Sequence, residues 1–251
     1  LSGASASVIR GLIKNRIIIE ESIPVDLSYS KLLIGKGKKK LSKEQLEAAE
    51  KLKLSVREGN YGTTLLKGVT GSGKTEVYLE AVAEALRKGR QVLVLLPEIA
   101  LTSAFIDRVQ ERFGCKPAEW HSGITKTEKN RCWQMVASGN AELIVGARSA
   151  LYLPFKDLGL IVVDEEHDSS YKQEDGILYN ARDMAVLRAS LNSAVVILAS
   201  ATPSLETWVN ASIGKYKRLN LQNRYGVSEL PKISFIDMRD CLLYTSDAAD
   251  E

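Results

Sequence analysis

The sequence has few cysteines and no long apolar run. Cys115, Cys132 and Cys241 are its three cysteines and none forms a CxxC pair, which excludes a disulfide scaffold and leaves no set of zinc ligands. The longest apolar stretches, such as 92–96 and 160–163, are far shorter than the ~20 residues that a membrane-spanning helix needs. No basic start followed by an apolar stretch opens the chain, so we expect no secretory signal. These absences predict a soluble, cytosolic globular protein.

The charge is nearly balanced overall but unevenly distributed. The chain has 34 Lys and Arg against 31 Asp and Glu, yet residues 1–43 hold nine basic and three acidic side chains. A basic N-terminal segment followed by a slightly acidic remainder is a weak indication of nucleic-acid binding. The run 35–40 (GKGKKK) is by itself equally typical of a solvated linker. We place a domain boundary there, with residues 1–34, a helix and a short β unit, before a large domain at 41–240.

From residue 41 onward the pattern alternates between helix and strand. Ser42 followed by Gln45 predicts a capping box at the start of a helix. Strands are predicted at 63–67, 91–96, 143–145, 160–163 and 194–198, and helices at 75–88, 103–113, 126–137 and 181–189. This alternation predicts an α/β fold with a parallel sheet.

Residues 68–75 (GVTGSGKT) fit the GxxxxGK[ST] pattern of a phosphate-binding loop (P-loop). Glycines let consecutive backbone N–H groups turn towards an anion, and the following helix adds its positive end. Lys74 would reach the β- and γ-phosphates and the Thr75 hydroxyl would bind Mg²⁺. The residues predicted to bind ATP here are Gly68, Thr70, Gly71, Ser72, Gly73, Lys74 and Thr75.

A second motif, 160–167 (LIVVDEEH), is an apolar strand that ends in three acids and a histidine. Ligands bind at the carboxyl ends of parallel strands. Asp164 would hold the Mg²⁺ of the nucleotide, and Glu165 would orient and deprotonate the attacking water. Alone, the acids would be typical of a solvated strand end and His167 of ordinary packing. Beside the P-loop, they become candidate catalytic residues together with Lys74.

Three further motifs argue against a kinase or a simple ATPase. Residues 97–102 (PEIALT), 146–150 (GARSA) and 200–203 (SATP) each follow a predicted strand. Loops in such positions can meet a nucleic-acid backbone through N–H groups and hydroxyls. The hydroxyls of Ser200 and Thr202 can also hydrogen-bond to the end of the acidic strand and pass the nucleotide state onward.

The ordered set GVTGSGKT, LLPEIALT, HSG, VGARSA, VVDEEH and ASATPS resembles the first motor lobe of a superfamily 2 helicase, a RecA-like P-loop NTPase lobe. Residues 164–183 are similar, more narrowly, to the aromatic-rich loop of the primosomal replication-restart DNA helicases. In that family the loop couples DNA contact to ATP hydrolysis, and a histidine usually stands where this chain has Asn180. The resemblance covers roughly residues 1–240.

This resemblance implies an ATP-dependent 3′→5′ DNA helicase of the bacterial cytoplasm and nucleoid. Its partners would be forked and single-stranded DNA, primosome proteins and single-strand-binding protein. Residues 1–34 would end a winged-helix domain, Gln45 would read the adenine, and Zn²⁺ would be held by residues absent here. Tyr171 and Tyr179 would stack on unpaired bases. The DNA-contact and coupling residues that it implies are Thr102, Arg148, Ser149, Tyr171, Lys172, Gln173, Tyr179, Arg182, Ser200 and Thr202.

A superfamily 2 motor needs a second lobe, and 48 residues follow Pro203, too few for a lobe of ~100–150 residues. We therefore predict that this chain alone binds nucleotide weakly, hydrolyses little and does not unwind DNA. We interpret 241–251, which depart from the family pattern, as a non-native tail. The alternatives that stay open are the first lobe of another superfamily 2 helicase or translocase, a small-molecule kinase, and a DNA-binding module without motor activity.

Overall fold

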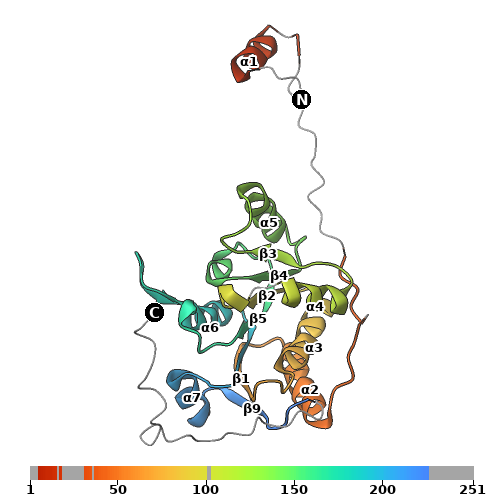
Figure 1. Ribbon diagram of the computed structural model, residues 1–251, viewed down its shortest axis with the longest axis vertical. Coiled ribbons are helices and arrows are strands. Elements are labelled where there is room, and N and C mark those ends of the chain that lie inside the picture. The colour runs from red at the N-terminus through yellow and green to blue at the C-terminus, as the bar shows by residue number, and fades with distance from the viewer. Residues whose placement is uncertain (1–4, 16, 19–30, 36, 101–102, 226–251) are drawn as a thin grey trace, which may run out of the picture.

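The computed structural model describes residues 5–15, 17–18, 31–35, 37–100 and 103–225. Their centre is a seven-stranded sheet in the order β3-β4-β2-β5-β8-β1-β9, in which every neighbouring pair is parallel (Figure 1). The strands are β1 (Gly62–Gly68), β2 (Gln91–Leu95), β3 (Ala118–Trp120), β4 (Leu143–Gly146), β5 (Leu158–Asp164), β8 (Val195–Ser200) and β9 (Lys217–Leu221). The predicted α/β fold with a parallel sheet is confirmed.

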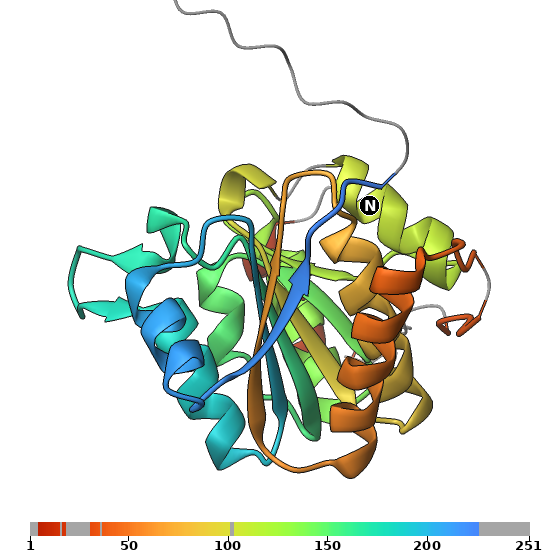
Figure 2. The same ribbon diagram turned by 90° about the horizontal axis from the view of Figure 1, so that it is seen from below.

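Helices cover both faces of this sheet, as the view in Figure 2 shows. One face packs against α2 (Lys43–Glu58), α3 (Lys74–Arg87) and α4 (Ser103–Phe113), and the other against α5 (Lys126–Ser138), α6 (Ala181–Leu191) and α7 (Leu205–Ser212). Successive strand side chains point to opposite faces. In β2, Val92 and Val94 therefore join the first core cluster, whereas Leu93 and Leu95 join the second.

The capping box predicted at the start of α2 is confirmed. The Gln45 backbone N–H donates to Ser42 Oγ at 3.3 Å, and the Ser42 backbone N–H donates to Gln45 Oε1 at 2.9 Å. This pair of bonds begins the helix. It also fixes the Gln45 side chain, which is buried.

The N-terminal region is described in part. The predicted helix is present as α1 (Ala6–Lys14), but Ile17 and Ile18 lie in a bend rather than in the predicted strand. The rest of that β unit, 19–30, lies outside the described residues, so the winged-helix interpretation stays a prediction. Two lysines of the basic run contact the large domain, because Lys38 pairs with Glu80 at 3.7 Å and Lys39 with Glu76 at 3.2 Å. Both stay half exposed, so the linker interpretation stays a prediction.

Short elements connect the strands at the carboxyl edge of the sheet. They are η1 (Glu98–Ala100), η2 (Arg148–Tyr152), η3 (Ser169–Tyr171) and a two-stranded antiparallel hairpin, β6 (Lys172–Gln173) with β7 (Tyr179–Asn180). Across the described ranges, none of the helices has both the length and the apolar character needed to cross a bilayer. The motifs named from the sequence lie in or beside these connections.

Candidate functional site

The P-loop bridges the end of β1 and the start of α3. Gly71 and Gly73 adopt φ of +81° and +78°, a conformation that glycine takes at little cost. A Cβ on Gly73 would lie 2.4 Å from Gln45 Nε2, so this position needs glycine for space as well. The loop is therefore shaped to direct backbone N–H groups at an anion near the N-terminus of α3.

Lys74 lies at the base of this loop and is buried. Its Nζ donates to the Gly68 carbonyl oxygen at 3.0 Å and lies 3.9 Å from Glu165 Oε1. The Ser72 hydroxyl is buried without a hydrogen-bond partner among the described residues, and the Ser72 backbone N–H donates to the Val69 carbonyl oxygen at 3.0 Å. Ser72 does not line the cavity described below, so its contact with a nucleotide stays a prediction.

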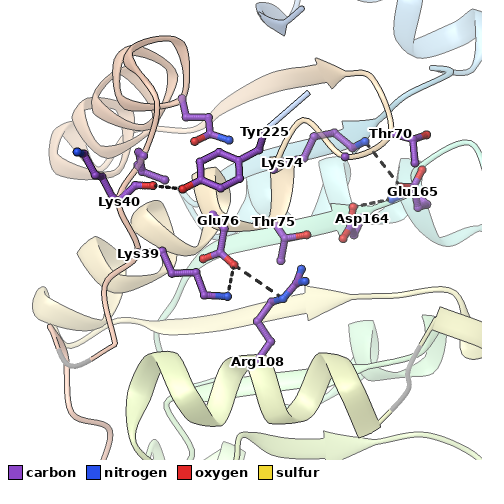
Figure 3. A pocket seen from close by; sticks show the side chains of 14 residues that line it. Lys39, Lys40, Thr70, Lys74, Thr75, Glu76, Arg108, Asp164, Glu165 and Tyr225 are labelled. Atoms are coloured by element: carbon purple, nitrogen blue, oxygen red, sulfur yellow. Dashed lines mark hydrogen bonds and ion pairs between the residues drawn. The ribbon is translucent and has the colours of Figure 1, made fainter. Parts of the chain in front are cut away.

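A cavity of about 450 Å³ opens above the P-loop (Figure 3). It brings together the loop, the acidic strand end and the start of α2. The side chains of Thr75, Asp164 and Glu165 lie close together in Figure 3, and Gln45 lines the same cavity. The residues that line it are Lys39, Lys40, Leu41, Gln45, Thr70, Gly71, Gly73, Lys74, Thr75, Glu76, Arg108, Asp164, Glu165 and Tyr225.

Asp164 ends β5 and is largely buried. Burial raises the pKa of its carboxyl group, while a hydrogen bond from the Tyr78 hydroxyl to Oδ2 at 2.8 Å acts to lower that pKa. The Glu165 backbone N–H donates to the other oxygen, Oδ1, at 3.0 Å. Both oxygens of Asp164 are thus oriented by neighbours. Tyr78, on α3, was not singled out from the sequence.

Two predicted motifs, 160–167 and 200–203, meet at Glu165, His167 and Ser200. Glu165 has φ of +46°, an uncommon conformation for a residue other than glycine. His167 Nδ1 lies 2.8 Å from Ser200 Oγ and 3.6 Å from Glu165 Oε2, and the Thr202 backbone N–H donates to Ser200 Oγ at 3.0 Å. A hydrogen bond thus links the Ser200 hydroxyl to the acidic motif, and the coupling role of Ser200 and Thr202 stays a prediction.

Glu166 is a functional candidate that sequence reasoning missed. It is 1% exposed and accepts hydrogen bonds from the backbone N–H and hydroxyl of Ser204, at 2.8 and 3.0 Å, and from the Thr207 hydroxyl at 2.9 Å. Arg182 Nη1 lies 3.4 Å from the same carboxylate. Glu166 therefore ties the acidic motif to the starts of α6 and α7, rather than lying at a solvated strand end.

The base stacking predicted for Tyr171 is wrong, because its ring is buried. Tyr171 is 1% exposed, and its hydroxyl lies 3.0 Å from the Leu95 carbonyl oxygen and 2.6 Å from that of Asp164. Its ring is therefore not available to stack on a base. Arg182, named from the sequence as a DNA-contact or coupling residue, is buried in ion pairs with Glu166 and Asp183. Coupling roles for both residues stay predictions.

Other predicted DNA contacts lie around the β6–β7 hairpin. Arg148 Nη1 donates to the Lys172 carbonyl oxygen at 2.8 Å, and Ser149 Oγ accepts from the indole N–H of Trp120 at 3.2 Å. Tyr179 packs edge-on against Tyr152, with ring centroids 5.4 Å apart. Lys172 is exposed, Gln173 is partly exposed, and Thr102 lies outside the described residues. DNA contact by this group stays a prediction.

Asn180, where the resembled family usually has histidine, caps α6. Its side-chain oxygen accepts from the Arg182 backbone N–H at 3.0 Å. Asparagine is among the preferred N-cap residues, so the substitution keeps the start of this helix intact. The hairpin therefore remains attached to the helix that carries Arg182.

The donor atoms at the cavity fit Mg²⁺. No cluster of three or more His, Cys, Asp or Glu side chains suited to a metal occurs in the part of the chain that the structure describes. A nucleotide-bound Mg²⁺ needs less, because it takes one or two carboxylates and the phosphates themselves. The Thr75 hydroxyl and the Asp164 carboxylate both line the cavity and supply the hard oxygen donors that this ion prefers.

Comparisons with known proteins agree with this geometry. The family model described as DEAD/DEAH box helicase matches residues 42–210. The "Replication restart protein PriA" of Rickettsia felis is 52% identical over 79% of this chain and 30% of its own length, and that of Bacillus subtilis is 40% identical over 94% of this chain and 30% of its own length. The chain thus spans about 30% of the length of these curated relatives.

A solved structure with lower sequence identity to this chain has a similar fold. The chain titled "Structure of RecG bound to three-way DNA junction" is 21% identical, with a TM-score of 0.56 over 90% of this chain and 26% of that one. Because the matched family model includes the P-loop, the acidic strand end and the SATP motif, the chain belongs to the DEAD/DEAH box helicases and is similar, within them, to the replication restart protein PriA.

Proposed function

We propose that this chain is the ATP-binding motor lobe of a DNA helicase that acts in replication restart. One observation carries the proposal: Lys74, Thr75, Asp164 and Glu165, which come from two motifs far apart in the sequence, line one cavity together with Gln45. The similarity to replication restart proteins supports the biological role.

Each of these side chains has a defined task in nucleotide binding. Lys74 would place a positive charge beside the β- and γ-phosphates, and Thr75 and Asp164 would hold Mg²⁺, which neutralises phosphate charge when bound. Gln45 would bind the adenine edge, because a glutamine amide can pair with N6 and N7 together. Glu165 would accept the proton of the attacking water.

His167 and Ser200 would pass the state of the site onward. Their 2.8 Å contact joins the loop that carries Glu165 to the end of β8. A change at Glu165 would therefore reach the SATP motif through one hydrogen bond. The β6–β7 hairpin would supply the DNA side of this coupling.

The finer biological assignments follow from the family resemblance. They are 3′→5′ unwinding, action at stalled forks in the cytoplasm, and contact with forked DNA, single-stranded DNA, primosome proteins and single-strand-binding protein. RecG, whose fold is similar, was solved bound to a three-way DNA junction. Zn²⁺ would belong to parts of such helicases other than the described residues.

The chain alone would bind nucleotide weakly and hydrolyse little. It spans about 30% of the length of its curated relatives, and arginines from a second lobe complete the ATP site in such motors. Residues of that kind contribute on the order of 10³–10⁵ in rate in related phosphoryl-transfer enzymes. Substantial DNA-stimulated ATP hydrolysis by the purified chain would contradict this part of the proposal.

Calorimetric titration of the chain with ADP and Mg²⁺ tests the central claim. Binding should be measurable in the unmodified chain, lost in Lys74→Ala, and retained in Lys88→Ala, which removes an exposed lysine from the far end of α3. Forked DNA should change the ADP affinity of the unmodified chain. Equal ADP binding by both lysine variants would refute the nucleotide site, and no effect of DNA would refute the coupling.

A further inference from the structure

Tyr225 lines the nucleotide cavity, although none of the motifs includes it. It lies four residues beyond the end of β9, and Figure 3 shows its side chain at the cavity. Gln45 and Tyr225 line this cavity together, and both also line a second, neighbouring cavity. The phosphate side of the cavity is explained by the P-loop and Asp164. Tyr225 belongs to the other side, where a nucleotide would place its base.

Hydrogen bonds hold this tyrosine in place. Its backbone N–H donates to the Gly71 carbonyl oxygen at 2.9 Å, and its hydroxyl donates to the Lys40 carbonyl oxygen at 3.1 Å. Just upstream, the Gln222 backbone N–H donates to Glu44 Oε1 at 2.7 Å. The segment 222–225 is therefore attached to the P-loop and to the first turn of α2.

Ordinary packing does not account for the position of the ring. Tyr225 is 56% exposed, whereas Tyr78 and Tyr171 in the same lobe are buried. An aromatic ring that is held at both its backbone and its hydroxyl, but not covered, leaves a face open to a flat partner. Nucleobases stack on such faces whatever their sequence identity.

Gln45, beside it, is oriented for the edge of the same partner. Its Nε2 donates to the Ser72 carbonyl oxygen at 2.8 Å, and its Oε1 accepts from the Ser42 backbone N–H at 2.9 Å. A primary amide keeps one more N–H and one more lone pair after these two bonds. The cavity thus offers a ring face and an amide edge on the side away from the phosphates.

We propose that Tyr225 is the base-stacking wall of the nucleotide site. The base of ADP or ATP lies against its ring while Gln45 binds the base edge. This inference rests on the proposed function, because it needs a nucleotide in this cavity.

The test compares a ligand that has a base with one that lacks it. ADP and inorganic tripolyphosphate, each with Mg²⁺, are titrated calorimetrically into the unmodified 251-residue chain, Tyr225→Ala, Tyr225→Phe and Tyr61→Ala. Tyr61 is a matched control, since it is 43% exposed and lies just before the amino end of β1. The cavity lies at the carboxyl end of the same strand, beside the P-loop. Loss of one base–aromatic stack corresponds to about 5- to 150-fold in affinity.

Tyr225→Ala should lose ADP affinity by a factor in that range and keep tripolyphosphate affinity. Tyr225→Phe, which keeps the ring, should lose less, and Tyr61→Ala should bind both ligands as the unmodified chain does. Unchanged ADP affinity in Tyr225→Ala would overturn the inference, and so would equal loss of both ligands, which would show that Tyr225 supports the P-loop instead. Failure of the unmodified chain to bind either ligand would instead overturn the proposed function itself.

Discussion

Tyr78 donates its hydroxyl to Asp164 Oδ2 at 2.8 Å, which joins the helix after the P-loop to the end of β5 across 86 positions of the chain. Tyr78 is fully buried, and burial beside the Asp164 carboxylate raises its pKa well above the ordinary range. The hydroxyl therefore stays protonated and acts as a donor. This bond therefore connects the helix that begins at the P-loop directly to the acidic motif.

Tyr78→Phe should weaken the Mg²⁺-dependent part of nucleotide binding. The variant keeps the ring but leaves Asp164 Oδ2 without its donor, so the carboxylate loses an orienting partner. Loss of such a supporting bond typically costs about 10- to 100-fold in metal affinity. Calorimetry of ADP binding with Mg²⁺ and with EDTA should show the loss in the first condition only.

Tyr152→Phe is the control for this substitution. Tyr152 is 53% exposed and packs against Tyr179, away from the cavity. The Tyr152→Phe variant should bind ADP as the unmodified chain does, both with Mg²⁺ and with EDTA. If Tyr78→Phe lost ADP affinity equally with Mg²⁺ and with EDTA, Tyr78 would serve the P-loop helix generally rather than Asp164.

Asp164→Asn should stabilise the nucleotide-free chain near neutral pH. Burial raises the pKa of Asp164, so the folded state favours the protonated carboxyl, and ionisation at higher pH costs stability. The loss of stability is absent when the pH is below the ordinary pKa of an aspartate. It is complete once the pH has risen above the raised pKa of Asp164 in the folded chain. Urea unfolding should show the variant more stable at pH 7–8, with the difference vanishing towards pH 3. The opposite trend with pH would contradict the assignment.

Periodicity was sufficient to predict most of the fold. The continuous apolar runs became β2, β5 and β8 at the centre of the sheet, because strands buried on both faces have no polar alternation. β3 and β9 were missed. β3 has three residues, and β9 (KRLNL) is an edge strand with exposed charged side chains, so neither carries an apolar pattern that a sequence could show.

The residues of the candidate site could be predicted where they belong to a sequence motif with a recognisable role in nucleotide binding. Lys74, Thr75, Asp164 and Glu165 were placed from two local patterns and do line one cavity. Tyr225 could not be found in this way, because its place depends on backbone hydrogen bonds to Gly71 and Lys40. The sequence likewise could not show that the Tyr171 ring points into the core.

Glu166→Ala should destabilise the lobe strongly. The substitution leaves the Arg182 guanidinium without its buried partner and takes the acceptor from the hydroxyls of Ser204 and Thr207. Removal of one member of a buried charged network typically costs about 3–5 kcal/mol. Because Arg182 keeps its bond to Asp183, we expect the lower part of that range in the free energy of urea unfolding.

Glu206→Ala provides a matched comparison with the same arginine. Glu206 lies 3.6 Å from Arg182 Nη1, but its side chain is 70% exposed. Exposed ion pairs contribute about 0–1 kcal/mol, so this variant should unfold almost as the unmodified chain does. Similar losses in Glu166→Ala and Glu206→Ala would mean that burial of the Glu166 network does not set its strength.

Gly59 and Gly73 have similar backbone conformations but differ in the space available for a Cβ atom. Both have positive φ, +70° and +78°, and Gly59 ends α2 as its C-cap. A Cβ on Gly59 would meet nothing within 4 Å, whereas one on Gly73 would lie 2.4 Å from Gln45 Nε2. An alanine at either site would have similar backbone strain. Only at Gly73 would its Cβ also collide with the Gln45 side chain.

Gly59→Ala should lose roughly 1–2 kcal/mol of unfolding free energy, the usual cost of a left-handed conformation for a residue with a Cβ, and should keep its ADP affinity. Gly73→Ala should lose at least as much stability and, in addition, ADP affinity, because Gln45 must leave its bond to the Ser72 carbonyl oxygen. Parallel urea unfolding and ADP titration of the two variants separate strain from collision. If ADP affinity fell equally in both, the loss would come from backbone strain alone and Gln45 would have no part in binding the nucleotide.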